Sequence, residues 1–347
     1  CVTGWTYAWH SVAAVNCARL FPDFSPILPP RLRVGARMSL PPDDNPTSQQ
    51  IAPISVARVR RLFAQPSRVA ESQFLRREIA GRMFERLALI KAQPARILDA
   101  GCGEGDDLLG LHQAFPQAQR WGIDASSAML AQARRAGAQS VSGMQRVLAR
   151  LFAPRAAATQ GAALACADFG QLPLPPSSID LLWSNLALHW HPQPHAVIRE
   201  WARVLRTDGL LMFSCFGPDT FRELREAFAA AAGASDAGER HVLPFVDLHD
   251  YGDMLVAAGF ATPVMDMEKL NITYTEIDRL LSDVRAFGGN PLFNRRKGLH
   301  GRRTWQRFVD VLMASRDAEG KLSLSVEVIY GHAFKPRPRT TLAGESI

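Results

Sequence analysis

Cysteine is scarce in this chain, and its spacing argues against two kinds of site. The 347 residues include five cysteines: Cys1, Cys17, Cys102, Cys166 and Cys215. Their number is odd and no two form a C-x-x-C pair, which argues against a zinc site and against a disulfide framework. The last three fall in predicted strands or turns, where buried reduced thiols are the simplest interpretation. We therefore expect a cytoplasmic protein.

Long apolar runs are also missing. No stretch approaches the roughly 18 consecutive apolar residues that a membrane-spanning helix needs, so we expect no membrane association. The hydrophobic fraction of 47% is ordinary for a globular chain. The net charge of +7 can steer an acidic partner towards the surface. Nucleic acid is not favoured as that partner, because the sequence has no basic stretch interleaved with aromatic residues and no known nucleic-acid module.

The dinucleotide fingerprint G-x-G-x-x-G is absent, although a related turn is present. Residues 96–107 read R-I-L-D-A-G-C-G-E-G-D-D, which indicates a strand, a tight turn and a helix start. The candidate ligand-binding residues here are Asp99, Gly101, Gly103 and Gly105. The acidic neighbours Glu104, Asp106 and Asp107 would repel a pyrophosphate at the helix start but would tolerate a cation. A nucleoside ligand with a positive centre, such as S-adenosyl-L-methionine, fits this turn better.

Acidic residues also end the next two predicted strands. Asp124, followed by Ala125, lies about 20 residues beyond the glycine turn, where a carboxylate can accept hydrogen bonds from ribose hydroxyls. Asp168 and Phe169 end the third strand, over 164–169, and could take the adenine by hydrogen bond and apolar contact. Each acid alone is more often a turn or cap residue, but three in order at successive strand ends favour one binding site.

These motifs resemble a known family. Residues 98–105, 122–124 and 168–174 look like the class I S-adenosylmethionine-dependent methyltransferases, and 180–190 resembles the BioC group within them. The resemblance covers roughly residues 56–335. It implies S-adenosylmethionine as methyl donor, Asn185 on the methionine side, and malonyl-acyl-carrier protein as acceptor in biotin synthesis. An acidic carrier protein is therefore the expected partner.

A second resemblance leaves the reaction open. Residues 216–225 are also similar to the mitochondrial complex I assembly factor that hydroxylates an arginine, and so are 189–190 and 243–245. That relative has the same fold and a different reaction. Methyl transfer to malonyl-acyl-carrier protein, hydroxylation, and methyl transfer to another acceptor all remain possible at this point.

The expected fold is α/β, a Rossmann-like class I methyltransferase with a seven-stranded sheet, helices on both faces, an N-terminal helical lid and a cap inserted after the fifth strand. The domains are a disordered extension over 1–54, a lid over 55–92, a cofactor-binding core over 93–216, a cap with the end of the sheet over 217–335, and a disordered tail over 336–347.

Three local predictions accompany this domain plan. Pro66 should divide the lid into two helices. Residues 260–266 and 270–274 read as two separate strands. The extension is rich in proline and has no helical or strand period, so we expect native translation to start at Met38.

The catalytic residues are harder to name. A carboxyl group with a pKa near 4 is already ionised at neutral pH, so methylating it needs no general base. His189 and Trp190 are candidates because they lie beside the predicted cofactor edge. His189 and His191 stand one residue apart without a third ligand, so no metal is expected.

A basic cluster in the cap is the candidate site for the carrier protein. It consists of Arg285, Arg295, Arg296, Lys297, Arg302 and Arg303. Such a patch could steer an acidic partner, and an ordinary solvated surface is an equally good interpretation.

Overall fold

The computed structural model describes residues 54–139, 161–232, 241–287, 289–295 and 301–337. Outside these ranges lie Met38, Arg296, Lys297, the predicted extension apart from Ile54, and the predicted tail apart from Pro336 and Arg337. No helix within the described ranges is long and apolar enough to cross a membrane.

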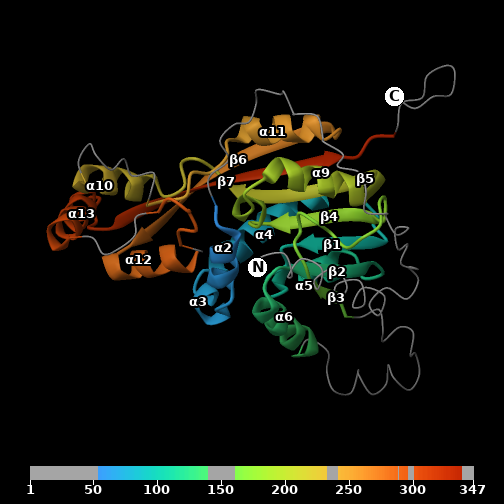
Figure 1. Ribbon diagram of the computed structural model, residues 1–347, viewed down its shortest axis with the longest axis horizontal. Helices are drawn as coiled ribbons and strands as arrows, with labels where there is room; N and C mark the ends of the chain where they lie inside the picture. The colour runs from blue at the N-terminus through green and yellow to red at the C-terminus, as the bar shows by residue number, and fades with distance from the viewer. Residues whose placement is uncertain (1–53, 140–160, 233–240, 288, 296–300, 338–347) are drawn as a thin grey trace, which may run out of the picture. The chain divides into compact units, whose positions relative to one another are not determined.

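A seven-stranded sheet forms the core, in the order β3-β2-β1-β4-β5-β7-β6 (Figure 1). Its strands are β1 (Arg96–Ala100), β2 (Gln119–Asp124), β3 (Ala163–Cys166), β4 (Ile179–Asn185), β5 (Leu205–Phe216), β6 (Ala261–Tyr274) and β7 (Leu322–Phe334). The first five run parallel, and β7 is antiparallel to both of its neighbours. β1 and β4 are almost wholly buried, as expected where helices cover both faces of a parallel sheet. The predicted seven-stranded α/β fold is confirmed.

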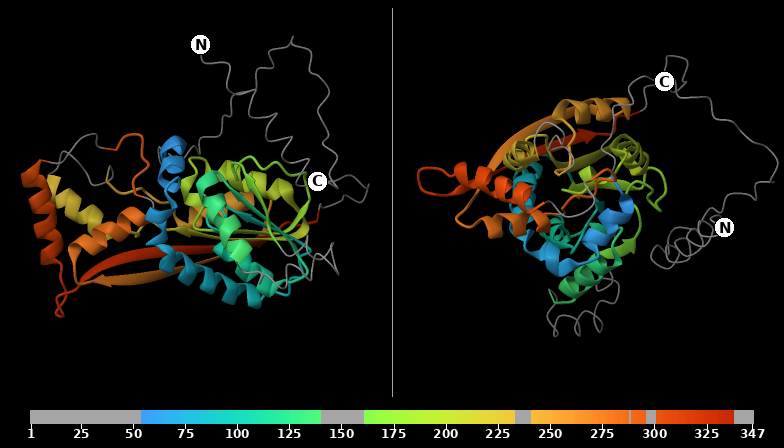
Figure 2. Two further views of the ribbon diagram at one scale, coloured as in Figure 1. Left: turned by 90° about the horizontal axis from the view of Figure 1, so that it is seen from below. Right: turned by 60° about the vertical axis from the view of Figure 1, so that its left-hand side comes forward.

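Helices lie on both faces of the sheet because side chains alternate along each strand (Figure 2). The helices of the core are α4 (Gln73–Ala88), α5 (Asp106–Ala114), α6 (Ser127–Gln139), α9 (Pro194–Val204) and α11 (Leu248–Ala257). On one face Trp183 of β4 stacks on Phe84 of α4, with ring centroids 4.5 Å apart. Trp183 pairs with Met212 of β5, so the next residue, Phe213, points to the other face. There its ring lies 6.4 Å from that of Trp201 in α9.

The cap surrounds the part of β6 and β7 that extends beyond the other strands (Figure 1). It consists of α10 (Arg222–Ala232), α12 (Ile277–Ala286) and α13 (Arg302–Ala314). α10 packs on α13, where the rings of Phe228 and Phe308 stack 4.0 Å apart. α10 follows β5, whereas α12 and α13 lie between β6 and β7. The cap expected within 217–335, after the fifth strand, is therefore built from two insertions, one after β5 and one after β6.

The two strands predicted over 260–266 and 270–274 are one continuous strand, β6. The charged residues in the middle of β6 interrupt the apolar pattern in the sequence. In the structure they stay in the strand, and the acids among them form ion pairs with arginines of α4. Arg86 of α4 binds Asp266, and Nη1 of Arg82 lies 2.8 Å from Oε2 of Glu268. The backbone of β6 pairs with β7 along this whole stretch.

The lid contains one more break than predicted. α2 (Val56–Phe63) is followed by α3 (Pro66–Ala70), which begins at the proline as expected. α3 ends after one turn, and α4 then starts at Gln73. The start of the lid is attached to the loop after α12: Ile54 forms an antiparallel bridge with Leu292, and the Ser55 amide donates to the Pro291 carbonyl over 3.0 Å.

Three smaller expectations were also wrong. Ile54 is buried and bridged, so it does not belong to a disordered extension. Arg337, placed in the disordered tail, lies 3.0 Å from the carboxylate of Asp208. Cys166 was expected to be buried but is exposed, because it ends the short edge strand β3, whereas Cys102 and Cys215 are buried free thiols.

Candidate functional site

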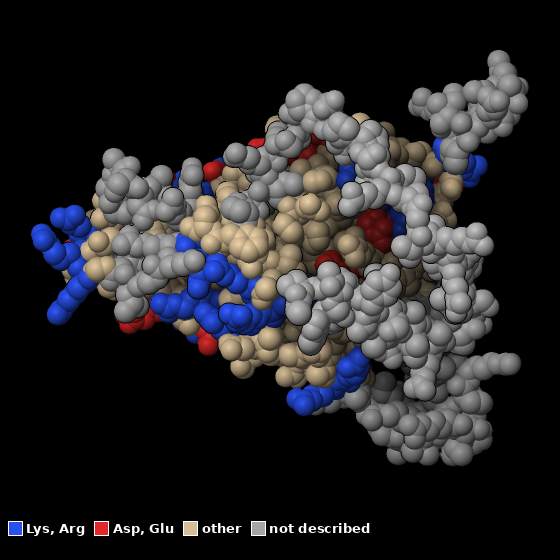
Figure 3. Space-filling view, viewed as in Figure 1, with Lys and Arg blue, Asp and Glu red and all other residues tan. Residues whose placement is uncertain are grey.

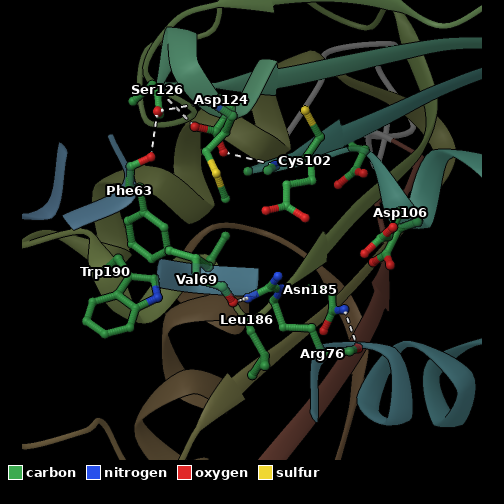
Figure 4. Close-up of a pocket in the computed structure, with 18 of the residues that line it drawn as sticks. Phe63, Val69, Arg76, Cys102, Asp106, Asp124, Ser126, Asn185, Leu186 and Trp190 are labelled. Carbon is green, nitrogen blue, oxygen red and sulfur yellow. Dashed lines mark hydrogen bonds between the residues drawn. The ribbon is translucent and has the colours of Figure 1, made fainter. Parts of the chain in front are cut away.

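One cavity lies at the carboxyl ends of β1, β2 and β4, beneath the lid (Figure 4). It encloses about 880 Å³, counting the space open to solvent. The sheet side supplies Asp99, Gly101, Cys102, Gly103, Glu104, Asp106, Asp107, Asp124, Ala125, Ser126, Met129, Phe169, Asn185, Leu186, Ala187 and Trp190. The lid and α4 supply Val59, Arg60, Phe63, Val69, Arg76 and Arg77. Most of the residues selected from the sequence thus line a single space.

The three glycines of the turn have different structural roles. All three have positive φ, which a side chain disfavours. Gly101 and Gly103 line the cavity, and a Cβ on Gly101 would lie 2.3 Å from the Cβ of Ala187. Gly105 does not line it. Gly105 precedes α5, and a Cβ there would lie 3.0 Å from the Cβ of Ala133 in α6, so Gly105 serves helix packing.

Asp124 is fixed at the end of β2 by two backbone amides. Its Oδ2 accepts from Gly103 over 3.0 Å, and its Oδ1 accepts from Ser126 over 2.7 Å. Burial raises the pKa of this carboxyl, and the two hydrogen bonds oppose the rise. Ser126 also connects the site to the lid, because its hydroxyl donates to the Phe63 carbonyl over 2.8 Å.

Two further carboxyls, the buried Asp99 and the partly buried Asp107, lie at the end of the cavity near β1 and β4. Asp99 is buried, and its Oδ2 has no hydrogen-bond partner among the described residues. Burial raises its pKa well above the usual value, and the nearby Asp107 and Asp124 add to the effect. Burial also raises the pKa of Asp107 to about 6, against hydrogen bonds from Trp183 and Asn185. The Trp183 indole donates to Asp107 over 2.8 Å.

Arg76 of α4 brings a cation to this acidic end. Its Nη1 donates to the Ser72 hydroxyl over 2.7 Å and to the Val69 carbonyl over 3.1 Å. Burial lowers the pKa of Arg76, while Glu104 and the other nearby acids oppose the change. The Asn185 side chain donates to the Arg76 carbonyl over 3.1 Å, so the carboxyl end of β4 holds this part of α4 (Figure 4).

The sequence did not single out Arg76 or Asp107 as site residues. Arg76 lies in a stretch where eight arginines look alike as a solvated face, and only tertiary structure separates it from the others. Asp107 was noted as an acid at the helix start. Its hydrogen bond to the indole of Trp183, a residue of β4, could not be read from spacing.

Phe169 lines the cavity, whereas Asp168 lies just outside it. Oδ1 of Asp168 accepts from the Gly170 amide over 2.8 Å, and its carboxylate lies 3.9 Å from Arg60 and 3.7 Å from His191. The sequence had suggested that Asp168 ends the third strand. β3 ends earlier, at Cys166, so Asp168 belongs to the turn that follows it.

The two catalytic candidates are placed differently. Trp190 lines the cavity and makes an edge contact with Phe63 of the lid, with ring centroids 5.6 Å apart. His189 lies behind it, with its ring centroid 4.8 Å from those of both Trp190 and Phe216. Burial lowers the pKa of His189 to about 3, so the ring is neutral. Among the described residues, no cluster of three His, Cys, Asp or Glu side chains could hold a metal ion.

This cavity fits a cationic nucleoside. The acids Asp99 and Asp107 favour positive charge, and the Asp99 oxygen that has no partner among the described residues can accept a hydrogen bond from a ligand. A Cβ on Gly103 would meet only Met129, at 3.6 Å, so the backbone at this point of the turn is open to close approach, whereas Gly101 lets Ala187 pack against the turn. Phe169 provides an apolar surface for a base.

Comparison with known proteins places the chain among methyltransferases. A family model described as a methyltransferase domain matches residues 98–213. The malonyl-acyl-carrier protein O-methyltransferase of Laribacter hongkongensis is 44% identical, over 82% of this chain and 92% of that protein. The protein of the same name from Gallionella capsiferriformans is 43% identical, over 81% and 92%. The crystal structure of the YcgJ protein from Bacillus subtilis aligns with a TM-score of 0.49 and 15% identity, covering 74% of this chain and 98% of that one.

Proposed function

Because the chain belongs to the family of malonyl-acyl-carrier protein O-methyltransferases, we propose that it methylates the free carboxylate of a malonyl group on an acyl-carrier protein. S-adenosylmethionine is the methyl donor. The similarity extends over 92% of the relative's length, and the cavity at the strand ends carries the proposal structurally. Formation of this ester removes the negative charge of the malonyl carboxylate.

The donor would be held by residues from four elements. Gly103 leaves room for it at the turn, Gly101 lines the cavity beside it, and Asp124 would accept hydrogen bonds from the ribose hydroxyls. Ala125 and Phe169 would contact the adenine. Asp168 remains a candidate for the adenine amino group from the turn beside Phe169, and its contacts with Gly170 and Arg60 would keep it there.

The methionine end of the donor carries both an ammonium and a carboxylate, and the cavity offers groups of opposite sign for them. Asp99, with its unpaired oxygen, would take the ammonium, and Asn185 lies beside it at the end of β4. Arg76 would take the carboxylate, because its guanidinium reaches the cavity from the lid side (Figure 4). When bound, the donor supplies a methyl group on a positively charged sulfur.

The acceptor would enter beside the lid, where Phe63, Val69, Leu186 and Trp190 make the wall apolar. Its carboxylate is ionised at neutral pH, so the protein need only orient it, and orientation can supply up to about 7–11 kcal/mol of the barrier. His189 fits this scheme as a support for Trp190, because it is neutral and lies off the cavity.

A transfer assay tests the proposal. The protein is incubated with methyl-labelled S-adenosylmethionine and malonyl-acyl-carrier protein, and acetyl-acyl-carrier protein serves as the matched acceptor without a free carboxylate. We expect label only on the malonyl form, in an ester that base releases. Tight donor binding with no transfer to either thioester would contradict the proposal and leave a hydroxylase-like assembly factor as the better hypothesis. Rescue of a biotin-requiring strain provides an independent check.

A further inference from the structure

We propose that the acyl-carrier protein docks on a basic face formed jointly by the lid and the cap, directly beside the cavity. This lid–cap face consists of Arg61, Arg68, Arg285, Arg295 and Phe293. The inference rests on the proposed function, because it assigns the surface that the acidic acceptor of that reaction would use.

Contacts between the lid and the cap make the face continuous. Ile54 bridges Leu292, and the Ser55 amide donates to Pro291, which joins the start of α2 to the loop that carries Phe293 and Arg295. α3 contacts α12, and the Ser282 hydroxyl of α12 lies 3.0 Å from the carboxylate of Glu71. Residues from distant parts of the sequence therefore share one surface.

The arginines of this face have no acidic partner among the described residues. All four of its arginines are exposed, and in the described ranges none forms an ion pair. The arginines of α4 behave differently, since Arg82 and Arg86 pair with acids of β6. Figure 3 shows Lys and Arg side chains gathered where Figure 1 labels α2, α3 and α12. An acidic partner would be steered to this region.

An exposed aromatic ring adds an apolar contact to the face. Phe293 is 62% exposed. It follows the buried Leu292 and precedes the exposed Arg295 in the loop after α12. Aromatic residues and arginine are the residue types enriched in protein interfaces. A partner that covers Phe293 would remove this apolar surface from water.

The face borders the mouth of the cavity. Val59, Arg60 and Phe63 of α2 and Val69 of α3 line the cavity, while Arg61 and Arg68 of the same two helices face solvent. A carrier protein bound to the arginines would thus hold its flexible acyl arm next to the lid side of the cavity. The two helices position the partner on one side and the donor on the other.

The basic cluster selected from the sequence is divided by the structure. Arg285 and Arg295 belong to the lid–cap face, whereas Arg302 and Arg303 begin α13, at the far end of the cap in Figure 1. Both residues of α13 are exposed arginines, so they provide a control with the same change of charge.

The test compares two double variants. Arg68→Glu/Arg285→Glu reverses two charges on the face, and Arg302→Glu/Arg303→Glu reverses two charges on α13. The value of kcat/KM is measured with malonyl-acyl-carrier protein and with malonyl-pantetheine, at about 0.01 M and about 0.15 M salt, over which the screening length falls from about 30 Å to about 8 Å. Donor affinity is measured by calorimetry to show that both variants are folded.

We expect the face variant to lose roughly tenfold in kcat/KM with the carrier protein at low salt, less at high salt, and nothing with malonyl-pantetheine. The α13 variant should match the wild type with both acceptors. Phe293→Ala should weaken the carrier reaction by a factor that salt does not change.

Equal losses in the two double variants would overturn the docking site, and so would an unchanged carrier reaction in the face variant. Loss of binding to a DNA duplex with a normal carrier reaction would make the face a nucleic-acid surface instead. Failure of the wild type to methylate either acceptor would refute the proposed function itself, which is a separate result.

Discussion

At the scale of single residues, the site depends on charges that the fold has placed in low-dielectric surroundings. Asp99 is buried and Asp107 and Asp124 are partly buried; all three have raised pKa values, and Arg76 faces them from α4. Such an arrangement is unfavourable in the empty protein and favourable around a ligand that carries both signs. The buried charges therefore contribute to binding rather than to stability.

Arg76→Gln tests the assignment of the donor's carboxylate. We expect roughly tenfold weaker binding of S-adenosylmethionine, because a charge-assisted hydrogen bond is replaced by a neutral one. An analogue of the donor without the methionine carboxylate should bind the variant and the wild type equally, and calorimetry measures both. Arg77→Gln is the matched control, since Arg77 also lines the cavity but is exposed. Equal weakening of both ligands in Arg76→Gln would mean that Arg76 only holds the lid.

Asp107 makes donor binding dependent on pH. Its pKa of about 6 lies above the ordinary value near 3.9, so between these pH values the folded protein holds a proton that the unfolded chain has lost. The contribution of this group to stability is therefore lost as the pH rises through about 6, and a cationic donor binds better to the ionised form.

We expect the donor to bind more weakly below pH 6 than above it and to release a fraction of a proton on binding near that pH. Calorimetry in buffers of different ionisation enthalpy measures the release. Asp107→Asn keeps an acceptor for the Trp183 indole and should reduce the release near pH 6. Release that is identical in the variant would remove Asp107 from this account and point to Asp99.

Residue spacing correctly predicted the site residues whose positions are set by the backbone of a single βα unit. It did not predict the residues whose positions depend on tertiary contacts. Asp99, Gly101, Gly103 and Asp124 line the cavity because each strand end and turn is fixed locally. Gly105 looked equivalent to its neighbours, but its role is to let α6 approach. Arg76 could not be separated from the other arginines, because its environment is made by β4 and α5, which come later in the chain.

At the scale of elements, local sequence patterns were again predictive, and long-range contacts were again not. β7 covers Leu322–Phe334, and the alternation of apolar and polar residues over 322–328 is typical of a strand. β6 was divided in two because its acids, which pair with Arg82 and Arg86, looked like a loop. The order of strands in space, with β7 between β5 and β6, cannot be read from the order in the chain.

The attachment of the lid to the cap is an element-scale prediction. Leu292 is 1% exposed and packs with Ile54 and Trp190. Leu292→Ala should lower the free energy of unfolding by about 2–5 kcal/mol and loosen α2. Denaturant titration measures the first effect, and hydrogen exchange of the α2 amides measures the second. Leu89→Ala makes the same change at a site that is 86% exposed and should have little effect. Unchanged exchange in α2 would show that the bridge does not hold the lid.

At the scale of the whole molecule, the lid and the sheet line one cavity and the cap is attached to the lid, so the donor should stabilise all three together. A ligand that binds only the folded state adds about 2.7 kcal/mol at a concentration of one hundred times its Kd. We therefore expect S-adenosylmethionine to raise the melting temperature measured by calorimetry, in one cooperative transition. Asp124→Asn should need about tenfold more donor for the same rise, because a neutral amide replaces the carboxylate that would bind the ribose. The ligand-free variant should melt in a single transition, which separates lost binding from lost folding. An identical rise in variant and wild type at every donor concentration would show that Asp124 only orders the turn through Gly103 and Ser126, and that the ribose binds elsewhere.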